Sequence, residues 1–132
     1  MEKINSRIRI NYNPTDLTNM DDIKLTIKKI QTEFSPVLIL INCAGKFIIK
    51  PISKSTLNDF DDLFTINVKI PFILTKEFSK DMKKERWGRI VNIGSSSSYT
   101  GFFGGTIYSA TKHAILGFSR SLQKELKEKN IR

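Results

Sequence analysis

Five consecutive apolar residues, Val37-Leu38-Ile39-Leu40-Ile41, lead directly into Asn42-Cys43-Ala44-Gly45, a stretch of small and polar residues. A short, unbroken run of Val, Ile and Leu is typical of a parallel strand that is buried on both faces. A second such run, Gly88 to Ile93, is followed in the same way by Gly94 and Ser95. The two runs predict a parallel sheet, and ligands bind at the carboxyl ends of the strands in open α/β sheets.

A helix is predicted on the amino-terminal side of the first run. Thr18 or Asn19 can act as its N-cap, and two acids follow in the first turn, where the helix dipole favours them. Pro36 ends the helix, and its apolar stripe is spaced by four, three and four residues: Ile23, Ile27, Ile30 and Phe34. Farther upstream, apolar and polar residues alternate and predict a half-buried strand through Ile8, Ile10 and Tyr12.

Two further helical segments complete an alternation of strands and helices. Residues 56–84 are predicted to form a helix in two pieces that meet near Asn67 and Pro71, because proline disfavours a helical residue before it. A last helix is predicted from about Thr106 towards Glu128, with an apolar stripe of Ile115, Phe118, Leu122 and Leu126. This order predicts a single α/β domain over residues 1–132, with a parallel sheet that helices cover on both faces.

The composition is that of an ordinary globular protein. The chain has 132 residues, of which 39% are hydrophobic and 27% are charged, and Cys43 is its single cysteine, which excludes an internal disulfide framework. The charged start has no apolar signal segment, and the longest apolar run is far too short to span a bilayer. A soluble, cytoplasmic protein without a membrane span is therefore predicted.

The net charge of +9 raises the question of nucleic-acid binding. Lys and Arg are spread along the chain, and their two local clusters, residues 80–89 and 124–132, also contain acids. Mixed clusters are typical of solvated helix faces. Binding of nucleic acid is not predicted, and it would require a steep dependence on salt to be credible. A positive field around an anionic cofactor or an acidic carrier is the better interpretation of the charge.

The last predicted helix carries Tyr108 and Lys112, and a spacing of four places both side chains on one helical face. An ammonium group beside a phenol favours the phenolate. A tyrosine in such a setting can give a proton to a carbonyl oxygen or take one from an alcohol. Taken by itself the pattern is weak, because it arises by chance in many helices. No cluster of residues has metal-ligand spacing, so no metal site is predicted.

Several segments together, in order, resemble the short-chain dehydrogenase/reductase family. Three of them are residues 88–95, the stretch Tyr108-Ser109-Ala110-Thr111-Lys112, and residues 117–122. They are most similar to the branch that contains 3-oxoacyl-(acyl-carrier-protein) reductases and carbonyl reductases. Ser95 stands thirteen positions before Tyr108, as the corresponding serine does in that branch.

Three more segments extend the resemblance over almost the whole chain. Asn42-Cys43-Ala44-Gly45 is similar to the Asn-Asn-Ala-Gly signature of the family, with cysteine in the second place. The stretch Thr65 to Val68 resembles the segment that bears the fourth catalytic residue of the family, here Asn67. Asp16-Leu17-Thr18 resembles the acidic position that meets the adenine ring of the cofactor in the family.

The resemblance implies an oxidoreductase that transfers hydride between NAD or NADP and a small-molecule carbonyl or alcohol substrate. Tyr108 would be the general acid or base, and Lys112 would support it and bind the nicotinamide ribose. Ser95 would hold the substrate oxygen, and Asn67 would anchor a water that links Lys112 to solvent. The implied cofactor-binding residues are Asp16, Asn42, Ala44, Gly45, Tyr108 and Lys112, with Asn42 acting more by bracing neighbouring strands than by touching the ligand.

The sequence departs from the family at both ends. Family members open with a strand, a Gly-rich turn and a helix that hold the pyrophosphate, but no glycine precedes Gly45 here. The sequence stops at Arg132, where family members continue into another strand and a substrate lid. We therefore expect a partial Rossmann-like, doubly wound parallel sheet that lacks the first βαβ unit and the C-terminal strand and lid. Residues 1–132 alone are expected to bind nicotinamide cofactor weakly or not at all.

Two functions remain open from the sequence. The first is the NAD(P)-dependent oxidoreductase described above, with the substrate and the choice between NAD and NADP undetermined. The second is a catalytically inactive fragment that acts by association with a related subunit. The resemblance also implies a homo-oligomer formed through the helices that hold Asn67 and Tyr108.

Overall fold

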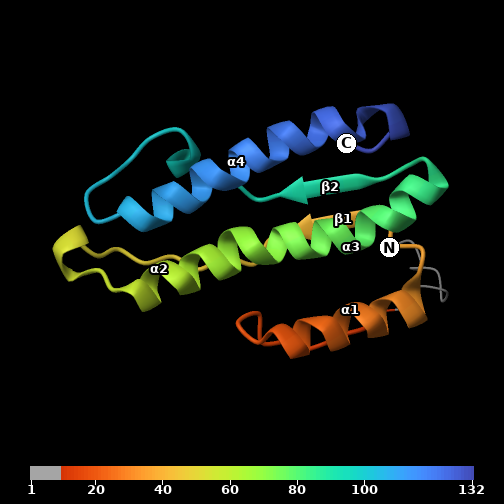
Figure 1. Cartoon of the computed structure of the whole chain (residues 1–132), viewed down its shortest axis with the longest axis horizontal. Helices are drawn as coiled ribbons and strands as arrows, with labels where there is room; N and C mark the ends of the chain where they lie inside the picture. The colour runs from red at the N-terminus through yellow and green to blue at the C-terminus, as the bar shows by residue number, and fades with distance from the viewer. Residues whose placement is uncertain (1–9) are drawn as a thin grey trace, which may run out of the picture.

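The computed structural model describes residues 10–132 as an alternation of helices and two strands (Figure 1). Short 3₁₀ turns and one π-helical turn connect or extend the main elements: η1 (Ile52–Lys54), the π-turn η2 (Thr65–Lys69), η3 (Ser96–Ser98) and η4 (Lys127–Lys129). The main elements are α1 (Met20–Phe34), β1 (Ile39–Asn42), α2 (Leu57–Phe64), α3 (Ile70–Glu85), β2 (Arg89–Asn92) and α4 (Thr106–Leu126).

The two strands are parallel, and the helices α2 and α3 form the crossover between them. In their register Leu40 faces Ile90 and Asn42 faces Asn92, so both strands end at the same level. At the start of β2, Gly88 also makes a parallel bridge to Ile131. Parallel strands joined by a helical crossover confirm the predicted α/β fold class, and among residues 10–132 the sheet has two strands.

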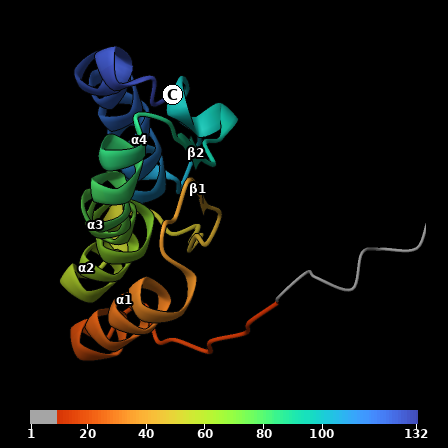
Figure 2. The ribbon, with the colours of Figure 1, turned by 90° about the vertical axis from the view of Figure 1, so that its right-hand side faces the viewer.

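Helices cover one face of this sheet, rather than both as predicted. Figure 2 shows α1 to α4 on one side of β1 and β2. Leu40 points towards the helices and is buried, whereas Ile39 and Ile41 are 57% and 60% exposed. The prediction of a strand buried on both faces was therefore wrong for β1. An apolar run does not specify which segments lie over each face, and no helix among the described residues covers the second one.

The half-buried strand predicted through Ile8, Ile10 and Tyr12 is also not found. Ile8 lies outside the described residues, while Ile10 and Tyr12 are outside any strand and almost fully exposed. An extended segment becomes a strand when a neighbour accepts and donates its backbone hydrogen bonds. Within residues 10–132 no strand pairs with this segment.

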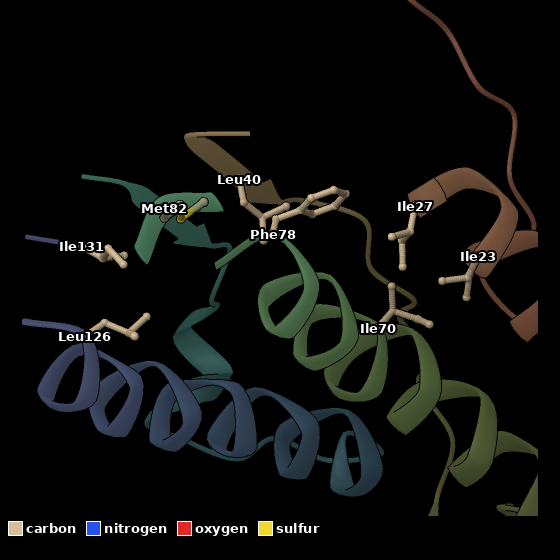
Figure 3. Close-up of a cluster of buried hydrophobic side chains, with 8 residues drawn as sticks. All are labelled: Ile23, Ile27, Leu40, Ile70, Phe78, Met82, Leu126 and Ile131. Atoms are coloured by element: carbon tan, nitrogen blue, oxygen red, sulfur yellow. The ribbon is translucent and has the colours of Figure 1, made fainter. Parts of the chain in front are cut away.

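The helix predictions agree with the structure. Asn19, one of the two expected caps, accepts hydrogen bonds at Oδ1 from the backbone N–H groups of Asp21 (2.9 Å) and Asp22 (3.4 Å). The apolar stripe of α1 faces the core, as its 3.6-residue spacing requires. The core joins α1, β1, α3 and the C-terminal segment through Ile23, Ile27, Leu40, Ile70, Phe78, Met82, Leu126 and Ile131 (Figure 3).

The predicted joint near Asn67 and Pro71 is a widened turn rather than a break. Residues Thr65–Lys69 form one π-helical turn between α2 and α3. Pro71 lies in the first turn of α3, where its missing N–H is tolerated. Asn67 is buried at the middle of the π-turn, and single π-turns within helices occur frequently at functional sites.

A tight contact at the start of β2 leads to a test of the packing. A Cβ atom on Gly88 would lie 2.5–2.7 Å from three atoms of the fully buried Met82. Gly88→Ala is therefore expected to lower the free energy of unfolding by about 1–3 kcal/mol, the usual cost of overpacking. The matched control is Gly117 in α4, where a Cβ would meet open space. Gly117→Ala is expected to raise stability by up to about 1 kcal/mol through helix propensity. Urea unfolding followed by tryptophan fluorescence measures both, and equal effects would contradict this packing.

The N-terminus of α2 leads to a prediction about pH. Asp59 completes a capping box with Thr56 and forms an ion pair with Lys50. The hydrogen bond from Lys50, followed by those from Thr56, lowers the pKa of Asp59 from its ordinary 3.8 to about 2. A carboxyl group with a lowered folded-state pKa stabilises the fold above its unfolded pKa, and this contribution is lost as the pH falls from about 4 through about 2.

Asp59→Asn is therefore expected to destabilise the chain at pH 7, and most of the difference from the parent chain should be lost by pH 2. Denaturant unfolding at both pH values measures the effect. A difference that persisted unchanged at pH 2 would show that the charge of Asp59 is not its cause.

Candidate active site

The predicted pair Tyr108 and Lys112 lies just beyond the carboxyl end of β2. Lys112 is buried, and its Nζ donates a hydrogen bond to the carbonyl oxygen of Ile93 at 2.8 Å. The same Nζ lies 5.8 Å from the centre of the Tyr108 ring. The i, i+4 spacing on α4 thus places an ammonium group beside a phenol, at the edge of the sheet where ligands bind in α/β proteins.

Asn67 connects the π-turn to two other segments. Its Oδ1 accepts a hydrogen bond from the backbone N–H of Lys46 (2.8 Å), and its Nδ2 donates to the backbone oxygen of Lys46 (2.9 Å). Nδ2 also donates to Oγ1 of Thr111 at 3.0 Å, and Thr111 Oγ1 donates to the carbonyl oxygen of Tyr108 at 2.7 Å. The buried amide therefore links the loop after β1 to the helical turn that carries Tyr108.

Ser95 follows β2 and caps the 3₁₀ turn η3 (Ser96–Ser98). Its Oγ accepts a hydrogen bond from the backbone N–H of Ser97 at 3.1 Å, and its own N–H donates to Oγ of Ser98 at 3.2 Å. The Ser95 side chain uses Oγ as an acceptor in these contacts. A hydroxyl group that accepts in this way still has its O–H available as a donor to a ligand oxygen.

The predicted cofactor-binding residues after β1 have different surroundings. Asn42 Nδ2 donates to Oδ1 of Asn92 at 2.7 Å, and Asn92 Nδ2 donates to Oγ of Ser119 at 2.9 Å. Asn42 thus links the two strands and, through Asn92, α4. Ala44 and Gly45 are exposed at the strand end, so their small side chains leave the backbone open to a ligand.

Asp16 begins the turn that precedes α1, where its carbonyl oxygen accepts a hydrogen bond from the N–H of Asn19. This turn lies on the side towards which both strands point (Figure 1). Asp16 Oδ1 accepts hydrogen bonds from the side chain (2.7 Å) and the backbone N–H (2.8 Å) of Thr18. These hydrogen bonds, the one from the side chain first, hold the pKa of Asp16 below its ordinary value. The carboxylate is thus fixed and exposed, although no contact in the structure joins it to Tyr108 or Lys112 among the described residues.

Two phenylalanines beside Tyr108 were not predicted from the sequence. The ring of Phe47 meets the Tyr108 ring edge to face, with centres 4.6 Å apart and planes at 84°. The ring of Phe102 lies 6.4 Å from Tyr108 and 6.1 Å from Phe47. Their positions in the sequence could have indicated them. Phe47 comes just after the Asn42–Gly45 stretch at the end of β1, and Phe102 lies in the Gly-rich loop before α4.

Neither a metal cluster nor a membrane-spanning helix is found in the described part of the chain. Residues 10–132 contain no cluster of three or more His, Cys, Asp or Glu that could hold a metal ion. In the same range, no helix is both long enough and apolar enough to cross a bilayer.

Comparison with known proteins shows which family shares this arrangement. The sequence model of the short chain dehydrogenases matches residues 1–132. The 3-oxoacyl-(acyl-carrier-protein) reductase of Aquifex aeolicus is 34% identical over 116 residues, which are 88% of this chain and 47% of that protein. Nodulation protein G of Rhizobium sp. strain N33 is 35% identical over 123 residues, which are 93% of this chain and 50% of that protein. The chain thus spans about half the length of these relatives.

Solved structures agree with the sequence relatives. A short-chain dehydrogenase from Streptomyces avermitilis superposes with a TM-score of 0.87 and 28% identity, over 91% of this chain and 44% of that chain. A 4-hydroxyisoleucine dehydrogenase complexed with NADH and succinate superposes with a TM-score of 0.83 and 32% identity, over 88% of this chain and 56% of that chain. Fold, motifs and relatives agree, and the chain belongs to the short-chain dehydrogenase family.

Proposed function

We propose that this chain carries the acid–base centre of an oxidoreductase that interconverts a carbonyl and an alcohol with NAD or NADP. The observation that supports this most directly is the Lys112 ammonium group, 5.8 Å from the Tyr108 ring at the carboxyl end of β2. Relatives of known structure support the choice of cofactor, since one is complexed with NADH and another with NADP.

In the proposed reduction, Tyr108 gives its hydroxyl proton to the substrate oxygen as the carbonyl becomes an alcohol. Ser95 donates its O–H to the same oxygen and stabilises the negative charge that develops there. Lys112 stabilises the phenolate left on Tyr108, since an adjacent cation favours the charged form of a phenol. In the oxidation direction the same groups act in reverse, and Tyr108 takes the proton from the alcohol.

The residues present fit the nicotinamide end of the cofactor. The nicotinamide supplies or accepts the hydride when it is bound. The ammonium group of Lys112 has three N–H donors. Among the described residues one of them is used, in the hydrogen bond to the carbonyl oxygen of Ile93. The remaining donors can hold ribose hydroxyls. Ala44 and Gly45 would lie near the adenosine side, and Asp16 near the adenine.

We assign Asn67 and Thr111 as positioning residues rather than catalytic ones. The side-chain amide of Asn67 is occupied by Lys46 and Thr111. In this geometry it fixes the loop after β1 relative to Tyr108. A water that links Lys112 to solvent, as the family resemblance implies, would then have to bind an oxygen of Asn67, since both Nδ2 donors are used.

We further propose a homo-oligomer through the helices that hold Asn67 and Tyr108. A groove of about 360 Å³ lies between α3 and α4, with Phe72, Phe118 and Leu122 among its lining residues. Apolar side chains in a groove between helices are suited to pack against the same surface of a second copy. We place the protein in the cytoplasm, where its exposed Cys43 would stay reduced.

A second candidate function is association without catalysis. Ile39, Ile41, Val91 and Ile93 are all more than two-fifths exposed on the uncovered face of the sheet. A contiguous apolar face of this kind favours contact with another polypeptide. In this alternative the chain is an inactive fragment that pairs with a related subunit.

Turnover of the chain with millimolar NADH or NADPH and simple ketones tests the proposed function. Tyr108→Phe is expected to lower kcat by about 100-fold or more, the usual contribution of a general acid. The matched control is Tyr99→Phe, which removes a hydroxyl from an exposed tyrosine that faces Arg120. The control is expected to keep the parent rate.

Equal rates for Tyr108→Phe and the parent chain would contradict the proposed role of Tyr108. If the parent chain turns over no ketone with either cofactor, the oxidoreductase proposal fails for this chain. Folding of the chain only in the presence of a related full-length subunit would then support the second candidate.

The positioning role of Thr111 leads to a separate test. Thr111→Val keeps the shape of a fully buried side chain but removes a hydroxyl that makes hydrogen bonds to Asn67 and Tyr108. The free energy of unfolding is expected to fall by about 1–3 kcal/mol, because the groups left behind are buried. Thr32→Val is the control, since its hydroxyl bonds to Lys28 on the surface of α1. If Thr111→Val lowered the free energy of unfolding no more than Thr32→Val does, the hydrogen-bond network of Asn67, Thr111 and Tyr108 would be contradicted.

A further inference from the structure

The two phenylalanines beside Tyr108 come from separate loops. Phe47 lies in the loop after β1, and Phe102 in the loop before α4. Their rings and the ring of Tyr108 lie within 6.4 Å of one another, measured between centres. We call Phe47 and Phe102 the aromatic collar. Edge-to-face contact also restricts the orientation of the Tyr108 ring.

Backbone contacts hold the collar in place. Lys50 N–H donates a hydrogen bond to the carbonyl oxygen of Gly104 at 2.8 Å, which ties the two loops together. Gly104 adopts a positive φ of 76°, a conformation that favours glycine. A Cβ on Gly105 would overlap the ring of Phe102. The Phe102 ring thus lies directly against the backbone at the start of α4.

The collar presents apolar surface to solvent. Phe47 is 56% exposed and Phe102 is 39% exposed, although both are held next to a candidate catalytic group. A ligand that covers these rings would gain the free energy of removing apolar surface from water. A ligand with hydroxyl groups at the same place would leave them without partners and lose their hydrogen bonds to water.

The charged residues of the same loop are already paired. Lys46 forms an ion pair with Asp62, and Lys50 forms one with Asp59. Both acids belong to α2, so the lysines point to that helix and their charges are balanced. This arrangement does not favour capture of a carboxylate or phosphate on the substrate by either lysine.

We propose that the aromatic collar selects substrates in which an aromatic ring or alkyl chain is attached to the reacting carbonyl carbon. Hydrophilic ketones and sugars are disfavoured at this position. The proposal rests on the function proposed for Tyr108, because the collar matters to catalysis only if the reacting oxygen lies at that residue. It assigns Phe47 and Phe102 to substrate selection.

The test compares acetophenone with dihydroxyacetone, a small ketone whose substituents are hydrophilic. Ligand-observed NMR on the whole chain, without cofactor, measures the affinity for each. The parent chain is expected to bind acetophenone at least about 10-fold more tightly than dihydroxyacetone, because the apolar contacts of one side chain in a pocket typically change relative affinity by about this factor. Phe102→Ala and Phe47→Ala are each expected to remove most of that preference.

Two further variants show whether the effect belongs to the collar. Phe103→Ala is the matched control, because Phe103 is the neighbour of Phe102 and is 86% exposed. It is expected to keep the preference, and Phe102→Leu is expected to retain most of it because the site stays apolar. Far-UV circular dichroism checks that each variant folds. Equal affinity of the parent chain for both ketones would overturn the proposal. It would also be overturned if Phe103→Ala lost as much of the preference for acetophenone as Phe102→Ala.

Turnover separates this proposal from the proposed function. With NADPH present, the ratio of kcat/KM for acetophenone to that for dihydroxyacetone is expected to fall about 10-fold in Phe102→Ala. If neither ketone reacts but binding of acetophenone depends on Phe102, the proposed function fails, and with it the role in substrate selection; only the preference of the collar for an apolar ligand stands. If both ketones react and the ratio is the same in Phe102→Ala and the parent chain, the assignment fails and the proposed function stands.

Discussion

The side-chain amide of Asn67 is the constraint on which the site depends. A buried amide needs hydrogen-bond partners, and Asn67 finds them on the loop after β1, at Lys46, and on α4, at Thr111. The π-turn places it between these two segments. Thr111 in turn donates a hydrogen bond to the carbonyl oxygen of Tyr108. These polar contacts therefore set the position of α4 relative to the end of β1.

Apolar packing and side-chain hydrogen bonds hold different parts of the two strands. The part of the apolar core that includes Met82 and Ile131 packs where β2 begins, beside Gly88. At the other end hydrogen bonds join Asn42 to Asn92, Asn67 to Thr111, and Lys112 to the carbonyl oxygen of Ile93. A close-packed apolar cluster tolerates small adjustments poorly. Directional hydrogen bonds at the ligand end instead hold individual groups in defined orientations.

Local pattern predicted much of this arrangement. The apolar periodicity indicated α1 and α4, the cap at Asn19 followed from residue type, and the i, i+4 spacing paired Tyr108 with Lys112. Contacts between distant positions could not be predicted, because Phe47 and Phe102 meet Tyr108 only once two loops are tied together. Burial of β1 was mispredicted for a related reason, since exposure depends on which segments cover a face. The π-turn depends on hydrogen-bond register, which residue types alone do not specify.

The hydrogen bonds around Tyr108 and Lys112 come from two neighbouring segments of the described chain, the end of β2 and the turn that holds Asn67. Asn67, Thr111 and the carbonyl oxygen of Ile93 make hydrogen bonds that position these two residues. The exposed side chains of the uncovered face, such as Ile39 and Ile41, make none of these contacts. Covering that face would add stability by removing apolar surface from water, without supplying a contact that the Tyr108–Lys112 pair lacks. The pair is therefore organised by the segments around it.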